Sequence, residues 1–171
     1  SALALSDDVF VVSSFSKYFN MTGWRLGWVV APERHVRDIE KLAQNLYISP
    51  PTLSQRAALA CFEPRTLAIL EARRDEFRAR RDLIVPALRS LGFGIPVMPT
   101  GGFFVYADTS AFSPDSRAFC RDVLERAGVA ITPGVDFGAH RAKEHVRFAY
   151  TIARGKIEDG IGRLARFLGR G

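Results

Sequence analysis

Lys17 lies in the stretch of this sequence that is best suited to covalent chemistry. Only four of the 24 basic residues are lysine, and no acidic residue lies between Val9 and Val30 to pair with Lys17. A lysine that follows a strand is, taken alone, more often a surface residue with its stem over apolar neighbours. An amine that attacks a carbonyl is instead best held in a dry pocket, which lowers its pKa. The scarcity of lysine favours this reactive role.

Two further polar residues flank Lys17 and could bind an anion. Ser14 precedes it by three residues, and Arg25 follows it by eight and opens a second apolar run. A guanidinium and a hydroxyl are suitable donors to phosphate or carboxylate oxygens. The alternatives are a turn hydroxyl bonded to its own backbone for Ser14 and a surface ion pair for Arg25. Together with the amine, these residues predict an anion-binding site for carbonyl chemistry.

The whole stretch resembles the lysine signature of the class I and II aminotransferases, which depend on pyridoxal phosphate and have the aspartate aminotransferase-like fold type I. That signature is a small, an apolar and a small residue before the lysine, then arginine eight positions later, an apolar residue and Gly or Ala. The residues that fill these positions here are Ser14, Phe15, Ser16, Lys17, Arg25, Leu26 and Gly27.

The resemblance implies a role for each candidate site residue. Lys17 would hold pyridoxal phosphate as a Schiff base and then move a proton as general base and acid. Ser14 and Arg25 would bind the cofactor's phosphate. Arg147, in a valine-arginine-apolar strand shortly before the last helix, resembles the arginine that binds the substrate's α-carboxylate. The activity implied is amino-group transfer between an α-amino acid and a 2-oxo acid.

The resemblance is also compatible with two other functions. The same fold and lysine serve lyases and decarboxylases, because the outcome depends on which substrate bond stands perpendicular to the cofactor ring. The fold also serves as the effector domain of some transcription regulators, which commonly have a proline-containing loop after the lysine. Residues 20–24 contain no proline, which favours an enzyme.

Several parts of the family's site have no counterpart in this chain. The acid that bonds the pyridine nitrogen, the residue that stacks on the ring and further phosphate donors all lie upstream of the lysine strand in the family. Family chains are also about twice as long as these 171 residues. We therefore expect a C-terminal portion of such an enzyme that is inactive and binds the cofactor weakly by itself. The resemblance implies a homodimeric parent protein.

Composition and cysteine use predict a cytoplasmic globular protein. The chain is 47% hydrophobic and 25% charged, which is ordinary for a soluble protein. Cys61 and Cys120 lie in apolar, helix-like stretches and are expected to be buried thiols. No apolar run reaches the roughly 18 residues of a membrane span, and no leader pattern precedes the first strand. The three histidines share no metal-ligand spacing, so no metal is expected.

The net charge of +6 is concentrated near the C-terminus. Residues 141–171 hold eight Lys or Arg against three Asp or Glu. These arginines alternate with a helical apolar stripe and lack interleaved aromatic residues, so nucleic-acid binding is not expected. A solvated helix face, or a surface that meets an acidic segment, explains the charge better.

The pattern of elements predicts an α/β fold: the end of a large domain with a mostly parallel sheet, then a smaller α/β domain. Strands are expected at 9–13 and 25–30, each buried on both faces of the sheet. A helix is expected at 33–47 with one apolar face, followed by a break at Ile48–Pro51 and a helix from Thr52 to Cys61. A long helix then starts at Arg65 and is kinked or ended by Pro86.

The sequence pattern in the last third of the chain predicts a compact layer of strands and helices. Strand patterns cover 93–99, 103–108, 129–132 and 146–152. A helix begins after Ser113–Asp115, ends at Gly128 and buries Phe119, Val123, Leu124 and Ala127, and a final helix covers 157–168. The domains expected are residues 1–48 (large domain), 49–91 (hinge and connecting helices) and 92–171 (small domain).

Overall fold

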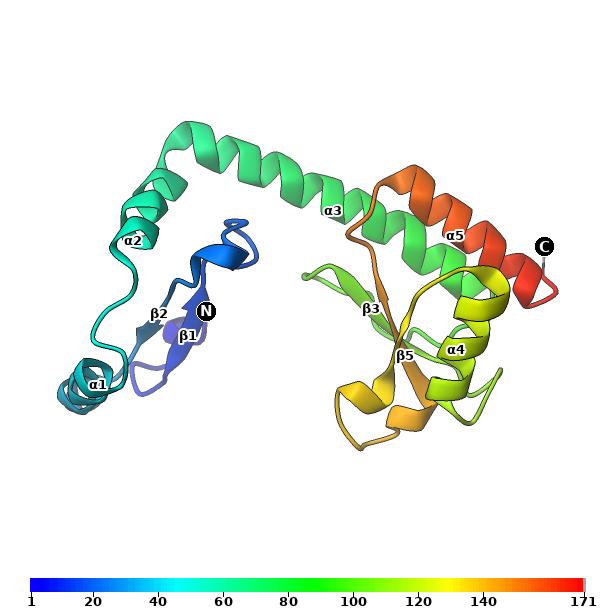
Figure 1. Cartoon of the computed structure of the whole chain (residues 1–171), viewed down its shortest axis with the longest axis horizontal. Coiled ribbons are helices and arrows are strands. Elements are labelled where there is room, and N and C mark those ends of the chain that lie inside the picture. The colour runs from blue at the N-terminus through cyan, green and yellow to red at the C-terminus, as the bar shows by residue number, and fades with distance from the viewer. Residues whose placement is uncertain (171) are drawn as a thin grey trace. The chain divides into compact units, whose positions relative to one another are not determined.

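The computed structural model describes residues 1–170 and confirms an α/β chain (Figure 1). The chain forms two compact units, Ser1–Arg74 and Asp75–Gly171, and each is described by itself. The three-part division of the chain made from the sequence remains a prediction. Helix α3 begins in the first unit and ends in the second.

The first unit contains two short strands that pair with each other. Strands β1 (Val11–Ser14) and β2 (Gly27–Val30) are antiparallel, with Val11 opposite Val30 and Ser14 opposite Gly27. The prediction that the two strands belong to a parallel sheet is wrong for this pair, because they run antiparallel. A parallel pair needs a crossover of a dozen or more residues, usually a helix. The segment between these strands contains a single 3-10 turn, Thr22–Trp24.

Helices α1 (Glu33–Leu46) and α2 (Thr52–Leu59) follow β2 at the predicted places. A 3-10 turn, Ala60–Phe62, continues α2. The apolar face expected on α1 is present but is not covered within this unit, because no residue of α1 is buried. The small core of the unit lies elsewhere and consists of Phe15, Met21, Ala58 and Cys61.

Helix α3 (Pro64–Ser90) is the longest element. Pro86 was expected to kink or end this helix, and an end at Pro86 is wrong, because the helix continues four residues further, to Ser90. A proline removes one backbone hydrogen bond and crowds the preceding turn. Burial of the residues beside Pro86 offsets that cost: Val85 is fully buried and Leu88 is 1% exposed.

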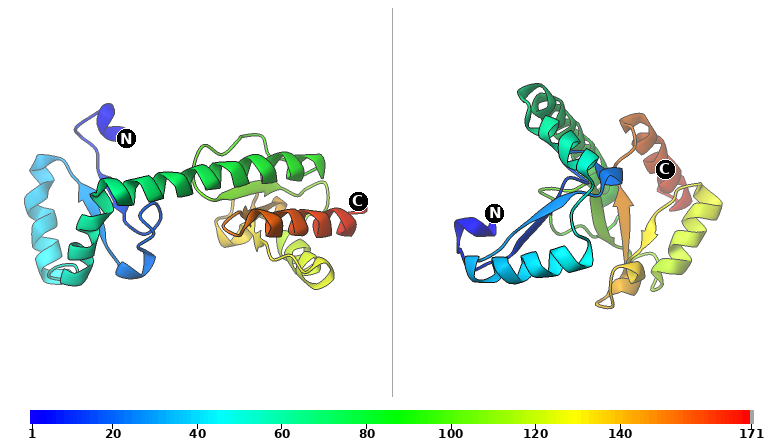
Figure 2. Two further views of the ribbon diagram at one scale, coloured as in Figure 1. Left: turned by 90° about the horizontal axis from the view of Figure 1, so that it is seen from above. Right: turned by 60° about the vertical axis from the view of Figure 1, so that its left-hand side comes forward.

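The second unit is a three-stranded antiparallel sheet with helices on one face (Figure 2). Strands β3 (Phe104–Asp108), β5 (His145–Ala149) and β4 (Thr132–Pro133) lie in that order. The strand predicted at 103–108 matches β3, and the one predicted at 146–152 ends three residues earlier, at Ala149. The strand predicted at 129–132 shares only Thr132 with β4. The strand predicted at 93–99 is wrong, because this segment forms only one isolated bridge, Gly94 to Asp108. Burial of Phe93 and Ile95 holds it against the core.

Helices α4 (Ser116–Ala127) and α5 (Arg154–Phe167) complete this unit. Asp115 caps α4 through the backbone N–H groups of Arg117 and Ala118, and Gly128 ends it in the left-handed conformation, as predicted. Leu124 was expected in the buried stripe of α4 but is 52% exposed. The buried residues of α4 are Ser116, Phe119, Cys120 and Val123, so the stripe lies further toward the start of the helix than predicted.

The pleat of the sheet separates its core face from the face that carries polar residues. Val105 and Ala107 of β3, and Val146 and Phe148 of β5, are buried with α3, α4 and α5 in the main core. Side chains alternate along a strand. The even-numbered residues of β3, such as Tyr106, therefore lie on the opposite face of the sheet, together with the odd-numbered residues of β5. Arg147 therefore belongs to the face that the helices leave open.

Both thiols are free and buried, as predicted. Burial raises the pKa of each, to about 11 for Cys120, where the nearby charge of Asp136 adds to the effect. Within residues 1–170, no helix is long and apolar enough to cross a membrane, and no group of three or more His, Cys, Asp or Glu side chains is placed to hold a metal ion.

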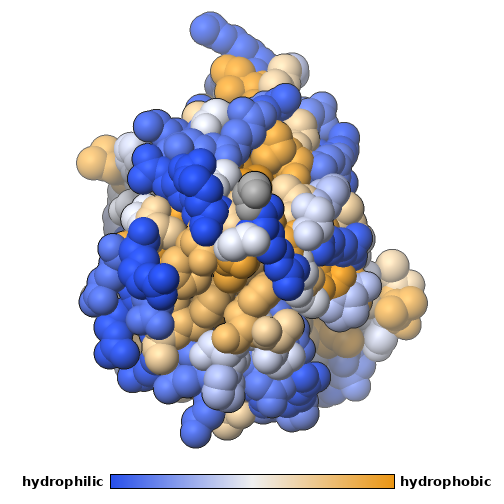
Figure 3. Space-filling view, turned by 90° about the vertical axis from the view of Figure 1, so that its right-hand side faces the viewer, coloured by the Kyte–Doolittle hydropathy of each residue, from blue (hydrophilic) through white to orange (hydrophobic). Residues whose placement is uncertain are grey.

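The basic residues of positions 141–170 lie on solvated surface, except Arg147, which is half-buried. Arg154, Lys156, Arg163 and Arg166 of α5 are all exposed, and Arg163 pairs with Asp159 at 3.0 Å one turn away. The face of the molecule in Figure 3 is hydrophilic around a smaller apolar area. This exposure agrees with the solvated helix face expected from the sequence.

Candidate active site

Lys17 lies in the loop that joins β1 to β2, at one end of the strand pair. Ser14 is the last residue of β1 and lies opposite Gly27 in the register. Arg25 is two residues before Gly27. A side chain at position 27 would place its Cβ 2.6 Å from the carbonyl oxygen of Ser13, so only glycine allows this close approach. The structure therefore brings Ser14, Lys17 and Arg25 to the same end of the pair.

The first part of the loop is held by backbone bonds and by two buried apolar side chains. The N–H of Phe15 donates to the carbonyl of Leu26 at 3.0 Å, and the N–H of Met21 donates to the carbonyl of Phe15 at 3.1 Å. Phe15 and Met21 are 7% and 6% exposed. The hydroxyl of Thr22 also donates to the carbonyl of Ser16 at 2.6 Å. The apolar residue before the lysine thus fixes the loop to the core of the unit.

Lys17 itself is exposed in the first unit. Its carbonyl accepts from the N–H of Asn20 at 3.0 Å, and Asn20 has a left-handed backbone with φ of 56°. The expectation of a dry pocket around the amine is therefore not met by the residues of this unit. The loop fixes the backbone of Lys17 and leaves the side chain at the surface.

Ser14 makes the turn bond to nearby backbone that the sequence offered as the alternative to phosphate binding. Its Oγ accepts from the N–H of Ser16 at 2.9 Å. A hydroxyl that accepts one bond still has its own proton to donate. The turn bond therefore orients Ser14 without using the donor that a phosphate oxygen would need.

Arg25 has a left-handed backbone, with φ of 50° and ψ of 53°, and its Nη1 donates to the carbonyl of Thr22 at 2.8 Å. A non-glycine residue in this region costs about 1–3 kcal/mol. The preceding residue, Trp24, is held by the hydroxyl of Ser54, which is 4% exposed and donates to its carbonyl at 2.7 Å. Ser54 on α2 was missed in the sequence, where a serine inside a helix gives no signal.

The donor set at this end of the strand pair fits a phosphorylated aldehyde. It consists of one primary amine, one hydroxyl and one guanidinium, and among residues 1–170 no carboxylate forms an ion pair with Arg25. A guanidinium without a carboxylate partner can bind two phosphate oxygens. The residues present therefore suit pyridoxal phosphate, with Lys17 for the aldehyde and Ser14 and Arg25 for the phosphate.

Arg147 lies in the second unit, on β5, between Tyr106 of β3 and Thr132 of β4. Its guanidinium carbon is 4.5 Å from the ring centroid of Phe137 and 5.5 Å from that of Phe104. Its Nη2 donates to the Thr132 hydroxyl at 3.4 Å, whereas its buried Nε has no hydrogen-bond partner. An unsatisfied buried donor is costly, so this guanidinium is suited to a further acceptor such as a carboxylate.

The loop after β4 places Phe137 against Arg147. Gly134 in this loop is buried, and a Cβ there would lie 2.5–2.7 Å from Tyr106 Oη and from the carbonyl oxygens of Ala142 and His145. The loop can follow this path only with glycine at position 134. Phe137, Phe104 and Thr132 were not predicted as site residues, because nothing in their spacing shows that they meet Arg147.

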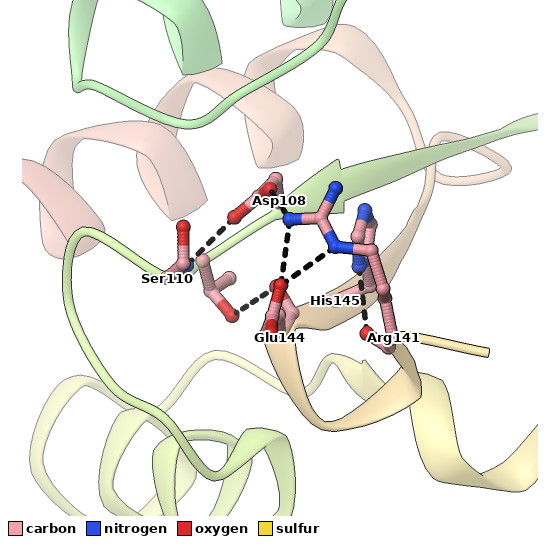
Figure 4. Close-up of polar contacts among 6 residues, drawn as sticks. Asp108, Ser110, Arg141, Glu144 and His145 are labelled. Carbon is pink, nitrogen blue, oxygen red and sulfur yellow. Dashed lines mark hydrogen bonds and ion pairs between the residues drawn. The ribbon is translucent and has the colours of Figure 1, made fainter. Parts of the chain in front are cut away.

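A network of charged residues lies at the turn that leads into β5 (Figure 4). Arg141 bridges Asp108 at 3.0 Å and Glu144 at 2.6 Å, and His145 Nδ1 contacts the Arg141 carbonyl at 2.9 Å. Burial pushes the pKa of Asp108 up, but hydrogen bonds from Ser110 and the charges of His145 and Arg141 outweigh burial and leave the pKa below its ordinary value. The network fixes the turn that leads into β5.

Comparison with known proteins defines the class. The family described as aminotransferase class I and II matches residues 2–164. The chain therefore belongs to the class I and II aminotransferase family, as the lysine signature predicted.

Individual relatives agree with this assignment. The chain is 40% identical to the valine–pyruvate aminotransferase of Mycobacterium tuberculosis over 163 residues, which are 95% of the chain and 42% of the relative. It is 36% identical to the aspartate/prephenate aminotransferase of Thermus thermophilus, over 93% of the chain and 40% of the relative. The crystal structure of an aminotransferase from M. tuberculosis superposes with a TM-score of 0.94 at 40% identity, over the whole chain and 44% of that structure. The chain thus spans about two fifths of the length of these relatives.

Proposed function

We propose that the whole protein transfers an amino group between an α-amino acid and a 2-oxo acid, with pyridoxal phosphate as cofactor. The observation that carries the proposal is the position of Ser14, Lys17 and Arg25 at one end of the β1–β2 pair. Membership of the class I and II aminotransferase family supports it. The relatives named above support amino acid and 2-oxo acid substrates without selecting a side chain.

Lys17 is the proposed covalent and proton-transferring residue. Pyridoxal phosphate, when bound, supplies a ring that withdraws electrons and so acidifies the α-proton of the amino acid. With the cofactor bound, the Lys17 amine would take this proton as a base and would give it back as an acid. A primary amine suits these steps because it acts as nucleophile, leaving group and proton carrier. The loop that fixes its backbone limits the positions the amine can reach.

Ser14 and Arg25 are the proposed phosphate ligands. The turn bond to the N–H of Ser16 orients the hydroxyl of Ser14, and the bond to the Thr22 carbonyl fixes one side of the Arg25 guanidinium. The remaining donors of both side chains are available to phosphate oxygens. Charge-assisted bonds of this kind are about twice as strong as neutral ones.

Arg147 is the proposed ligand for the substrate's α-carboxylate. The rings of Phe137 and Phe104 restrict its guanidinium, and the orphaned Nε gains an acceptor when a carboxylate binds. Substitution by lysine removes the planar, two-donor geometry while keeping the charge. The homodimer and the cytoplasmic location expected from the sequence remain predictions.

Amino-group transfer by the purified whole protein tests the proposal. Formation of a 2-oxo acid from an amino acid, with the nitrogen recovered in a second amino acid, is expected in wild type. Lys17→Ala should abolish it, and Arg147→Lys should raise KM for the amino acid much more than it lowers kcat. Lys41→Ala, which changes an exposed lysine of α1, is the matched control. Release of ammonia or carbon dioxide in place of nitrogen transfer would show a lyase or decarboxylase and overturn the proposal.

A further inference from the structure

The residue after Lys17 is tethered to the helix that joins the two units. The hydroxyl of Tyr18 donates to Oε1 of Glu71 on α3, 53 residues further along the chain. The acceptor carboxylate is itself fixed, because Arg74 pairs with it at 2.5 Å in the same helix. Glu71 lies three residues before the end of the first unit, and α3 continues into the second. None of the roles proposed above uses this tether.

The ring of Tyr18 is also held. It meets the ring of Phe19 edge-on, with centroids 5.0 Å apart at 82°, and Phe19 packs on Phe15 at 4.9 Å. Phe15 belongs to the core of the unit. The hydrogen bond from Tyr18 to Glu71 raises the pKa of the phenol, so the hydroxyl keeps the proton that it donates.

These contacts bracket Lys17. On its N-terminal side, Phe15 is buried two residues away, and on its C-terminal side Tyr18 is bonded to Glu71. The carbonyl of Lys17 also accepts a turn bond from the N–H of Asn20 at 3.0 Å. The Tyr18 bond adds a restraint from α3 at the residue next to the lysine.

We infer that Tyr18 and Glu71 are positioning residues for Lys17, holding the backbone of the loop so that its amine meets the cofactor's aldehyde in a reactive orientation. The inference rests on the proposed function of Lys17. It assigns α3 a part in the chemistry of the first unit, because the fixed end of the tether is a residue of that helix. Misplacement of a reacting group by about 1 Å can cost a hundredfold in rate. Loss of one solvent-exposed hydrogen bond is expected to cost less, about three- to tenfold.

The relative reactivity of two lysines in one molecule tests the inference. The purified protein, freed of cofactor, is mixed briefly with pyridoxal phosphate and cyanoborohydride, and the modification of Lys17 and of Lys41 is measured by peptide mass spectrometry. Lys41 serves as the internal reference, because loss of folding would change both sites. In Tyr18→Phe, which keeps the ring and removes the hydroxyl, the ratio of Lys17 to Lys41 modification should fall about three- to tenfold.

Further variants separate positioning from general stability. Glu71→Ala should lower the ratio as much as Tyr18→Phe, and the double variant no further, because both remove one interaction. Glu71→Gln keeps an acceptor and should retain most of the ratio, and Tyr47→Phe, at an exposed tyrosine of the same unit, should retain all of it. An unchanged ratio in folded Tyr18→Phe and Glu71→Ala would overturn the inference. Failure of wild type to favour Lys17 over Lys41 would instead overturn the proposed role of Lys17.

Discussion

Gly134→Ala is the substitution whose effect the structure defines most sharply. The added methyl would lie 2.5 Å from the carbonyl oxygen of Ala142, 2.5 Å from Tyr106 Oη and 2.7 Å from the carbonyl oxygen of His145. Two of these atoms belong to backbone: Ala142 is buried and His145 opens β5. Neither can withdraw without moving the strand that carries Arg147.

The size of the effect follows from overpacking. One extra methyl in a closely packed site typically costs about 1–3 kcal/mol. The second unit has about 100 residues, for which a loss of about 1 kcal/mol lowers Tm by roughly 4–8 °C. We therefore expect Gly134→Ala to lower the Tm of this unit by about 10 °C. Phe137, three residues later, should also lose its contact with Arg147.

A matched substitution at another glycine should change the free energy of unfolding in the opposite direction. Gly160 lies inside α5, and a Cβ there meets nothing within 4 Å. Gly160→Ala should raise stability by up to about 1 kcal/mol through helix propensity. Thermal unfolding followed by circular dichroism measures both variants, and hydrogen exchange should show faster exchange at β5 in Gly134→Ala. Wild-type Tm and exchange in Gly134→Ala would refute the packing argument.

Two further changes test the second unit. Asp115→Ala removes the N-terminal cap of α4 and should lower the free energy of unfolding in urea by about 1 kcal/mol. Glu125→Ala, at an exposed position of the same helix, should lower it little. Equal losses of stability in the two variants would contradict the role of the cap. Hydrogen bonds from Arg154 and Arg80 lower the pKa of Glu76 from its ordinary 4.5 to about 2. Because the folded pKa is the lower one, this contribution to stability is complete above pH 4.5 and is lost as pH falls toward 2. Glu76→Gln should remove that part of the pH dependence, and an identical pH profile in this variant would contradict the assignment.

Local sequence signals predicted the helices of this chain well. The start of α4 at Asp115 and its end at Gly128 follow from side-chain capping and from the left-handed freedom of glycine. Such signals act within a few residues, so they need no knowledge of the fold. The same reasoning allowed α3 to end at Pro86, but the helix continues to Ser90, where burial of Val85 and Leu88 outweighs that local rule.

Strand pairing was harder to predict than strand position. The apolar runs at β1 and β2 indicated two strands, but a continuous run does not reveal the direction of its neighbour. The direction depends on the loop of residues 15–26, whose path is set by burial of Phe15 and Met21. These are contacts with the core of the unit, including Ala58 and Cys61 far along the chain.

The candidate site was predicted by residue type more than by environment. Lys17, Ser14, Arg25 and Arg147 were selected from a signature and from position, and their roles remain proposals. The residues that surround them could not be selected in this way. Phe137 reaches Arg147 only because Gly134 lets the intervening loop pass close to β5. Tyr18 meets Glu71 across 53 residues, which no local pattern reports.

The covalent state of Lys17 in the purified whole protein tests the central claim most directly. Borohydride reduction in the presence of pyridoxal phosphate, followed by peptide mass spectrometry, locates any bond between cofactor and lysine. The account predicts that the phosphopyridoxyl group is on Lys17, close to one per chain, and nearly absent from Lys41, Lys143 and Lys156. Modification spread evenly over the four lysines, or concentrated on one of the other three, would contradict it.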